Sequence, residues 1–236
     1  MRSAGAGIRA IEAVLFDLGG TLIDTRDFGG WAESGRSLGL DVDAESIAAA
    51  WESARPWENR REDSPEELWA TVLSVASSVE VSSALVGRFL ELQRAKPLYG
   101  SLFSDVRRCL DRLQRSGKRL AIVSNSRSEP AVRELLVAIG IDSVFETVVS
   151  SGTERVRKPD REIFVRALSR LNVQPTAVLF VGDDLENDVR GATRAGLHAI
   201  WLNRTGTGED AGSPEILSLS EVPRIVRLIE AGAPVK

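Results

Sequence analysis

Hydrophobic and polar positions divide the chain into two kinds of pattern. From residue 97 onward, short apolar runs alternate with amphipathic segments about ten residues long. The apolar runs are typical of strands buried on both faces of a sheet, and the amphipathic segments of helices. Such strands are predicted at residues 13–16, 119–124, 145–150, 177–181 and 198–202. Alternation of this kind indicates βαβ crossovers and a parallel sheet.

The amphipathic segments have ordinary helix boundaries. Gly117, Gly140 and Gly196 follow three of them, where helices commonly end. Asp160 precedes another and is suited to cap its first turn. These helices are predicted at residues 104–116, 129–139, 160–171, 186–195 and 219–230. The predicted fold class is therefore α/β, a Rossmann-like parallel sheet core with helices on both faces.

Residues 27–95 show helical periodicity and no convincing strand. Four of the five tryptophans fall in this block, where they are suited to the core of a small bundle. Its helices are predicted at residues 28–38, 44–55, 65–77 and 81–93. Because the block follows the first predicted strand, we expect an inserted all-helical cap domain at residues 25–96. The α/β core domain would then comprise residues 1–24 and 97–236.

Composition mainly excludes certain partners and certain kinds of site. The 236 residues are 43% hydrophobic and 27% charged, which is typical of a globular protein. A net charge of −4 gives no basic footprint for nucleic acid, so no nucleic-acid partner is expected. Cys109 is the only cysteine, which excludes a disulfide framework and a thiolate metal cluster. A Ser-His-Asp triad would need His198, the only histidine, which falls in a predicted strand.

No targeting or membrane segment is visible. No apolar run approaches 18 residues, so no membrane span is predicted. Residues 1–9 lack the apolar core of a signal peptide. We therefore expect a cytoplasmic protein, either a monomer or a homodimer.

Polar residues stand where the predicted strands end or where the next helix begins. In a parallel sheet these positions converge at one edge, where open α/β folds place their chemistry. The set offers a carboxylate nucleophile, a hydroxyl donor, one ammonium and a second group of carboxylates. Phosphoryl transfer through an aspartyl-phosphate needs these groups, and Mg²⁺ prefers oxygen ligands. The residues are Asp17, Ser124, Asn125, Lys158, Asp183, Asp184 and Asp188.

The order of these motifs resembles that of the haloacid dehalogenase-like hydrolases. This superfamily contains aspartyl-nucleophile phosphatases with a helical cap inserted after the first motif, and the resemblance covers residues 11–230. It implies that Asp17 is the nucleophile. It also implies that Asp17, the Gly19 carbonyl and Asp183 bind Mg²⁺, and that Thr21 orients the first loop beside the substrate.

The same resemblance gives roles to the remaining motif residues. Ser124 would hydrogen-bond the phosphoryl group of the substrate, with Asn125 beside it. Lys158 would stabilise the negative charge. Asp188 would orient Lys158 or a metal-bound water, and Asp184 would be an outer ligand of the metal site.

The first motif departs from the phosphatase pattern at Gly19. Phosphatases of this kind carry Asp-x-Asp-Gly-Thr, whereas this chain has Gly19 at the second Asp position. That second Asp protonates the leaving oxygen, and general acid–base catalysis typically contributes about 10²–10⁴ in rate. Asp24 is not a substitute, because an Asp at this place is usual in capped members and sits at the hinge.

Three function classes follow. A Mg²⁺-dependent phosphatase acting on a small phosphorylated metabolite would favour acyl or aryl phosphates, whose leaving groups need no proton. A haloacid dehalogenase would resemble Asp-x-Tyr-Gly-Thr and lack the metal-binding Asp pair, so Asp183 and Asp184 argue against it. Phosphonatases use a cap lysine, and no lysine lies between residues 1 and 95. The third class is a catalytically weak or silent relative that binds a ligand or partner.

The cap of such enzymes supplies specificity, and two arginines there are candidates for substrate binding. Arg55 lies among tryptophans and further arginines at residues 51–63, where it could hold a second anionic group. The alternative for this stretch is a solvated connection, since acidic residues are interspersed in it. Arg26 lies near the predicted hinge. The sequence does not name the substrate.

Overall fold

The computed structural model describes residues 10–24, 26–58, 65–96, 100–206 and 212–235. The chain divides into two compact units. The core unit comprises residues 1–25 and 100–236, and the helical unit comprises residues 26–99. That the second unit acts as a cap stays a prediction.

The core unit contains a six-stranded sheet with the order β5-β4-β1-β6-β7-β8, in which neighbouring strands run parallel. All four residues of β1 are fully buried, because strands lie on both sides of β1 and helices cover both faces. The α/β class predicted from the sequence is confirmed. The strands are β1 (Ala13–Phe16), β4 (Arg119–Ser124), β5 (Thr147–Ser150), β6 (Val178–Gly182), β7 (His198–Leu202) and β8 (Glu215–Ile216).

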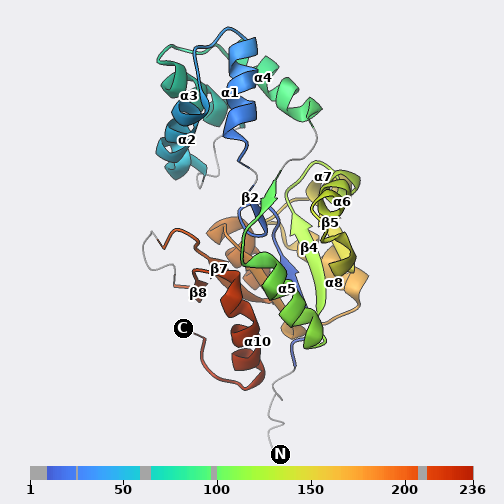
Figure 1. The fold of residues 1–236 in the computed structure, drawn as a ribbon. Coiled ribbons are helices and arrows are strands. Elements are labelled where there is room, and N and C mark those ends of the chain that lie inside the picture. The colour runs from blue at the N-terminus through green and yellow to red at the C-terminus, as the bar shows by residue number, and fades with distance from the viewer. Residues whose placement is uncertain (1–9, 25, 59–64, 97–99, 207–211, 236) are drawn as a thin grey trace, which may run out of the picture. The chain divides into compact units, whose positions relative to one another are not determined.

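Helices cover the sheet on both faces. Figure 1 shows α5 and α10 side by side on one face. On the other face, α8 and α9 pack against the side chains of Ala13 and Leu15, which alternate with those of Val14 and Phe16. The core helices are α5 (Val106–Arg115), α6 (Glu129–Ala138), α7 (Ser151–Glu154), α8 (Arg161–Leu171), α9 (Gly191–Arg194) and α10 (Val222–Glu230), with 3₁₀ turns η1 (Asp142–Val144), η2 (Pro175–Ala177) and η4 (Leu219–Glu221).

The helical unit has its own aromatic core. Trp69 lies at its centre, with ring centroids 4.9 Å from Trp31, 5.5 Å from Trp51 and 4.6 Å from Phe89. Trp31, Trp51 and Trp69 therefore do the packing expected of them, whereas the side chain of Trp57 lies outside the described residues. None of the helices in the described ranges is long and apolar enough to cross a membrane. The unit contains α1 (Phe28–Ser37), α2 (Ala44–Glu58), α3 (Pro65–Ser77) and α4 (Ser83–Ala95).

Three details differ from the sequence expectation. Two antiparallel strands, β2 (Ile23–Asp24) and β3 (Ser101–Leu102), flank the helical unit in the sequence, and two residues each is too short for a periodicity signal. β8 is equally short and was not expected. The helix predicted at residues 186–195 is present, but its first half, η3 (Leu185–Arg190), is a π-helix. The wider turn is visible in the bond from the Val189 N–H to the Asp184 carbonyl, five residues earlier, at 3.2 Å. The Asp184 side chain caps this helix by accepting from the N–H groups of Glu186 and Asn187.

A partly buried ion pair joins the first motif to distant segments of the core unit. The Arg204 guanidinium donates to both carboxylate oxygens of Asp105, at 3.0 and 3.1 Å, and to the carbonyls of Gly20 and Thr21. Asp105 also accepts from the Ser218 hydroxyl. This bidentate arrangement anchors the loop that follows β1.

We predict that Asp105→Asn lowers the free energy of unfolding by roughly 3 kcal/mol at pH 7. Burial alone would raise the pKa of Asp105, but hydrogen bonds from Arg204, Ser218 and the Leu219 N–H outweigh it, so this pKa lies below its usual value. The carboxylate therefore contributes stability above the ordinary pKa, and the contribution disappears as the pH falls through the lowered pKa. Denaturant unfolding of wild type and variant at pH 7 and below pH 3 measures this difference.

Asp111→Asn is the matched control, because Asp111 forms an exposed ion pair with Arg115 on α5. Its replacement should change stability by less than about 1 kcal/mol. A gap between wild type and Asp105→Asn that is as large in acid as at pH 7 would contradict the charge-based explanation.

Candidate functional site

The candidate site lies at the carboxyl edge of the sheet, where β1 ends between β4 and β6. Phe16, the last residue of β1, pairs with Ile122 on one side and Val181 on the other. The next residue, Asp17, continues this ladder through its backbone N–H, which donates to the Val181 carbonyl at 3.0 Å. The side chain of Asp17 is therefore held at the middle of the sheet edge, and the residue is only 7% exposed.

A buried lysine connects two of the predicted carboxylates. The Lys158 ammonium pairs with Asp17 and, at 2.6 Å, with Asp188. Burial opposes the charge of this ammonium, but the two carboxylates outweigh burial and raise the pKa of Lys158 above its usual range. Burial also raises the pKa of Asp188, and the ammonium opposes that rise. Lys158 is therefore a fixed positive charge directly beside Asp17.

Asn125 fixes the backbone that carries this lysine. Its side-chain amide donates to the Lys158 carbonyl at 3.0 Å, and its side-chain oxygen accepts from the Lys158 N–H at 2.8 Å. Asn125 follows Ser124, the buried last residue of β4. The paired hydrogen bonds join the ends of two sequence motifs 33 residues apart. Contact between Asn125 or Ser124 and a substrate stays a prediction.

The loop after β1 approaches Asp183 closely. Gly20 has a φ of 76°, and a Cβ atom there would lie 2.2 Å from a carboxylate oxygen of Asp183. The buried Thr21 hydroxyl donates to the other oxygen at 2.9 Å, and the Trp201 indole donates to the Asp183 backbone carbonyl. Glycine is thus required at position 20 both for its backbone conformation and for space.

Three carboxylates gather at this edge. Asp17, Asp183 and Asp188 each offer an oxygen, and these oxygens lie within 4.8 Å of one another. Asp183 is exposed as a residue, but protein atoms surround its carboxyl group closely enough to raise its pKa, and the carboxylates of Asp17 and Asp188 raise that pKa further. Three ionised carboxylates and the Lys158 ammonium together give the cluster a formal charge of −2. Hard oxygen ligands and this charge fit a Mg²⁺ ion.

The other predicted metal and substrate residues are placed differently. Asp184 uses both carboxylate oxygens within its own turn, accepting from the backbone of η3 and from the Asn187 side chain. Gly19 forms a backbone bridge with Ile23. Arg26 belongs to the helical unit, where its guanidinium lies 6.0 Å from the Phe28 ring. Arg55 falls in α2, and its side chain lies outside the described residues. The proposed roles of these four residues stay predictions.

Two supporting residues were not predicted from the sequence. Arg204 holds the carbonyls of the first-motif loop, and Trp201 holds the carbonyl of Asp183. Both lie at or just beyond the end of β7, in a stretch that contains none of the four motifs. The sequence offered one clue to both residues. They lie near the end of a predicted strand, and in a parallel sheet that end belongs to the same edge as the motifs.

Comparison with known proteins agrees with this geometry. The family model of the haloacid dehalogenase-like hydrolases matches residues 11–196. The chain belongs to this family. The family predicted from the motifs is thus confirmed, and with it the prediction of a hydrolase.

Individual relatives include phosphatases. The chain is 27% identical to N-acylneuraminate-9-phosphatase of Homo sapiens over 95% of this chain and 97% of that protein. It is 30% identical to phosphoglycolate phosphatase of Pectobacterium atrosepticum over 84% of this chain and 82% of that protein. In structure it resembles YfnB of Bacillus subtilis bound to magnesium, with a TM-score of 0.72 and 19% identity over 92% of this chain and 99% of that one.

We predict that Gly20→Ala weakens Mg²⁺ binding at least about tenfold, since the new methyl group must displace Asp183. Calorimetric titration with MgCl₂ measures the change. Gly117→Ala is the matched control, because Gly117 has a φ of 75° and no atom within 4 Å of its Cβ position. It introduces the same backbone strain without the clash. Equal affinities in the two variants would contradict the steric explanation.

Proposed function

We propose that this protein is a Mg²⁺-dependent phosphomonoester hydrolase that acts on a small phosphorylated metabolite through an aspartyl-phosphate on Asp17. The observation that carries the proposal is the placement of Lys158. Its buried ammonium contacts Asp17 and Asp188, while the carboxylate of Asp183 completes an oxygen cluster beside them. A carboxylate suited to be the nucleophile, a fixed positive charge and an oxygen cluster suited to a cation therefore support the proposal together.

In the first step a carboxylate oxygen of Asp17 would attack phosphorus. The new Asp17–phosphorus bond forms as the ester bond to the leaving oxygen breaks. Lys158 would stabilise negative charge on the phosphoryl oxygens, because its ammonium already lies against Asp17. The Ser124 hydroxyl, at the end of the neighbouring strand, would donate a hydrogen bond to the same group. When bound, Mg²⁺ would neutralise part of the phosphoryl charge.

In the second step water would attack the phosphorus atom, release inorganic phosphate and restore the Asp17 carboxylate. The position that supplies the acid and base in related phosphatases is Gly19, which has no side chain. The leaving oxygen must then take its proton from solvent or leave as a stable anion. Acyl and aryl phosphates, whose leaving groups are weak bases, are therefore the preferred test substrates.

The helical unit is proposed to act as a cap that selects the substrate. This follows from its insertion between the first and second motifs and from the family to which the chain belongs. Relatives named for sugar-acid, glycolate and serine phosphates support a small phosphorylated substrate. The carboxylates of Asp183 and Asp188 favour the metal-dependent reaction over haloacid dehalogenation, which needs no cation.

We predict that hydrolysis of acetyl phosphate and an aryl phosphate requires both Mg²⁺ and Asp17. Asp17→Asn should lower kcat by about 10³ or more, because it removes the nucleophile. Phosphate release with and without EDTA measures this, and the exposed Asp111→Asn serves as the control. Turnover that persists in Asp17→Asn would exclude the aspartyl-phosphate. If wild type hydrolyses no phosphate, assays with 2-haloacids distinguish a dehalogenase from a binding protein.

We predict that Gly19→Asp accelerates the hydrolysis of alkyl phosphates by up to about 10²-fold, and the hydrolysis of acyl phosphates far less. The new carboxyl group would protonate only those leaving oxygens that need a proton. Gly19 is not among the described glycines with positive φ, so the substitution requires no left-handed backbone. The measurement is the dependence of log kcat on leaving-group pKa, which should become shallower in the variant. An equal effect on all leaving groups would contradict the proposed defect.

A further inference from the structure

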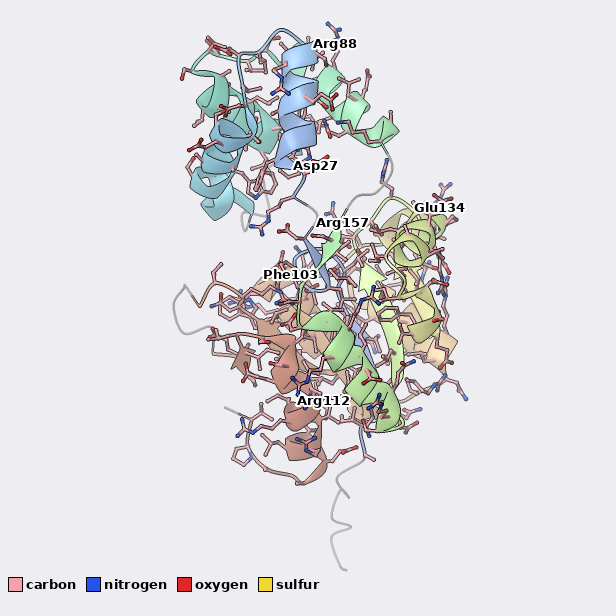
Figure 2. All side chains as sticks on the ribbon, viewed as in Figure 1. Asp27, Arg88, Phe103, Arg112, Glu134 and Arg157 are labelled. Atoms are coloured by element: carbon pink, nitrogen blue, oxygen red, sulfur yellow. The ribbon has the colours of Figure 1, made fainter. Side chains whose placement is uncertain are left out.

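An open hollow of about 370 Å³ lies on the core unit between the loops that follow β4 and β5. Arg127, Arg155 and Arg157 line it, and all three residues are exposed. Among the described residues that form its lining, none carries a carboxylate. Figure 2 labels Arg157 at the same end of the core unit as the carboxyl ends of the strands. The hollow therefore presents positive charge beside the candidate site.

The acidic residues of the neighbouring helices pair with other arginines. Glu154, at the end of α7, pairs with Arg166 at 2.6 Å and with Arg170. Glu129, at the start of α6, pairs with Arg170 at 3.0 Å. Arg166 and Arg170 belong to α8 and are not part of the lining of the hollow. These two carboxylates are thus already paired with arginines outside the hollow, which leaves the positive charges of Arg155 and Arg157 for an anionic ligand.

Hydrogen bonds hold the two loops of the hollow together. The Ser126 carbonyl accepts from the Gly152 N–H at 2.9 Å and from the hydroxyls of Ser150 and Ser151 at 2.9 and 3.2 Å. The loops approach so closely that a Cβ atom at Gly152 would lie 1.6 Å from the Arg127 carbonyl. The walls are therefore preorganised, which reduces the ordering cost of binding a ligand.

The hollow shares one residue with the candidate site. Asn125 lines the hollow, and the same side chain holds the backbone of Lys158. One N–H of the Asn125 amide makes the bond to Lys158, so the second is available as a donor to a ligand. Arg157 directly precedes Lys158 in the chain, and Ser124 directly precedes Asn125. The hollow therefore adjoins the segments that carry Ser124 and Lys158.

We propose that this hollow is a subsite for a second anionic group, so that the substrates are phosphomonoesters that also carry a carboxylate or a second phosphate. The inference rests on the proposed phosphatase function. The guanidinium groups would bind the second anion through paired, charge-assisted hydrogen bonds. Selectivity then arises in the core unit as well as in the proposed cap.

The first experiment compares matched substrates with the wild-type protein and Mg²⁺. All three series are aryl phosphates, whose leaving group needs no proton, with a side chain of increasing length on the ring. The side chain ends in a carboxylate in one series, in a phosphate in the second and in an uncharged methyl group in the third. We expect at least a tenfold higher kcat/KM for one charged series at its best length, and the better series identifies the anion. Equal kcat/KM across all three series would overturn the proposal.

The second experiment uses variants of the hollow. Arg155 has a φ of 57°, so Arg155→Gly removes its charge and also relieves the backbone. Combined with Arg157→Gln, this substitution should reduce at least tenfold the ratio of kcat/KM for the charged substrates to kcat/KM for the neutral ones. Arg115→Gln is the control, because Arg115 is a highly exposed arginine on α5, and it should keep the ratio. Each single variant is measured as well, in case the double variant does not fold. An unchanged ratio in folded variants would contradict the proposal.

The third experiment separates this inference from the proposed function. Calorimetry compares the binding of an ω-carboxyalkyl phosphonate with that of an alkyl phosphonate, and neither compound can be hydrolysed at the phosphorus–carbon bond. Tighter binding of the carboxylate compound by tenfold or more, lost in the Arg155→Gly and Arg157→Gln double variant, supports the subsite even if no phosphate ester is hydrolysed. Hydrolysis of phosphates without this difference in binding would uphold the phosphatase and overturn the subsite.

Discussion

The contact on which the site depends is the buried ion pair of Lys158 with Asp17 and Asp188. Three strands contribute to it, because Asp17 follows β1, Asp188 follows β6 and Asn125, at the end of β4, fixes the lysine backbone. Removal of one partner would leave an uncompensated buried charge, which is strongly unfavourable. The same pair therefore organises the fold at the sheet edge and places a positive charge where a phosphoryl group would bind.

Much of this arrangement could be predicted from the sequence, since it follows from topology. The apolar runs ending at Phe16, Ser124 and Val181 indicate parallel strands, and parallel strands bring the residues after them to one edge. The convergence of Asp17, Ser124 and Asp183 at this edge therefore follows from the strand pattern, whereas Lys158 was assigned to the site from its motif before α8. The order of the motifs also identified the family correctly.

The remaining parts depend on long-range contacts that leave no periodic pattern. Arg204 contacts the Gly20 carbonyl across 184 positions, and neither residue type signals the other. Hydrophobic spacing predicts a helix at η3, but it does not reveal that the Val189 N–H there bonds to the carbonyl five residues earlier, as in a π-helix. The basic hollow arises only when the loops after β4 and β5 meet, so its arginines looked like ordinary surface residues in the sequence.

The central place of β1 has a consequence for biosynthesis. The first strand of the core lies between β4 and β6, whose residues follow it by more than a hundred positions along the chain. A chain growing from its N-terminus must therefore keep an entirely apolar segment unpaired until residue 119 has been made, and half-paired until residue 178. During that interval the helical unit, whose packing is local, is complete in sequence. Before β4 is made, β1 is thus an apolar segment that has none of its native strand neighbours.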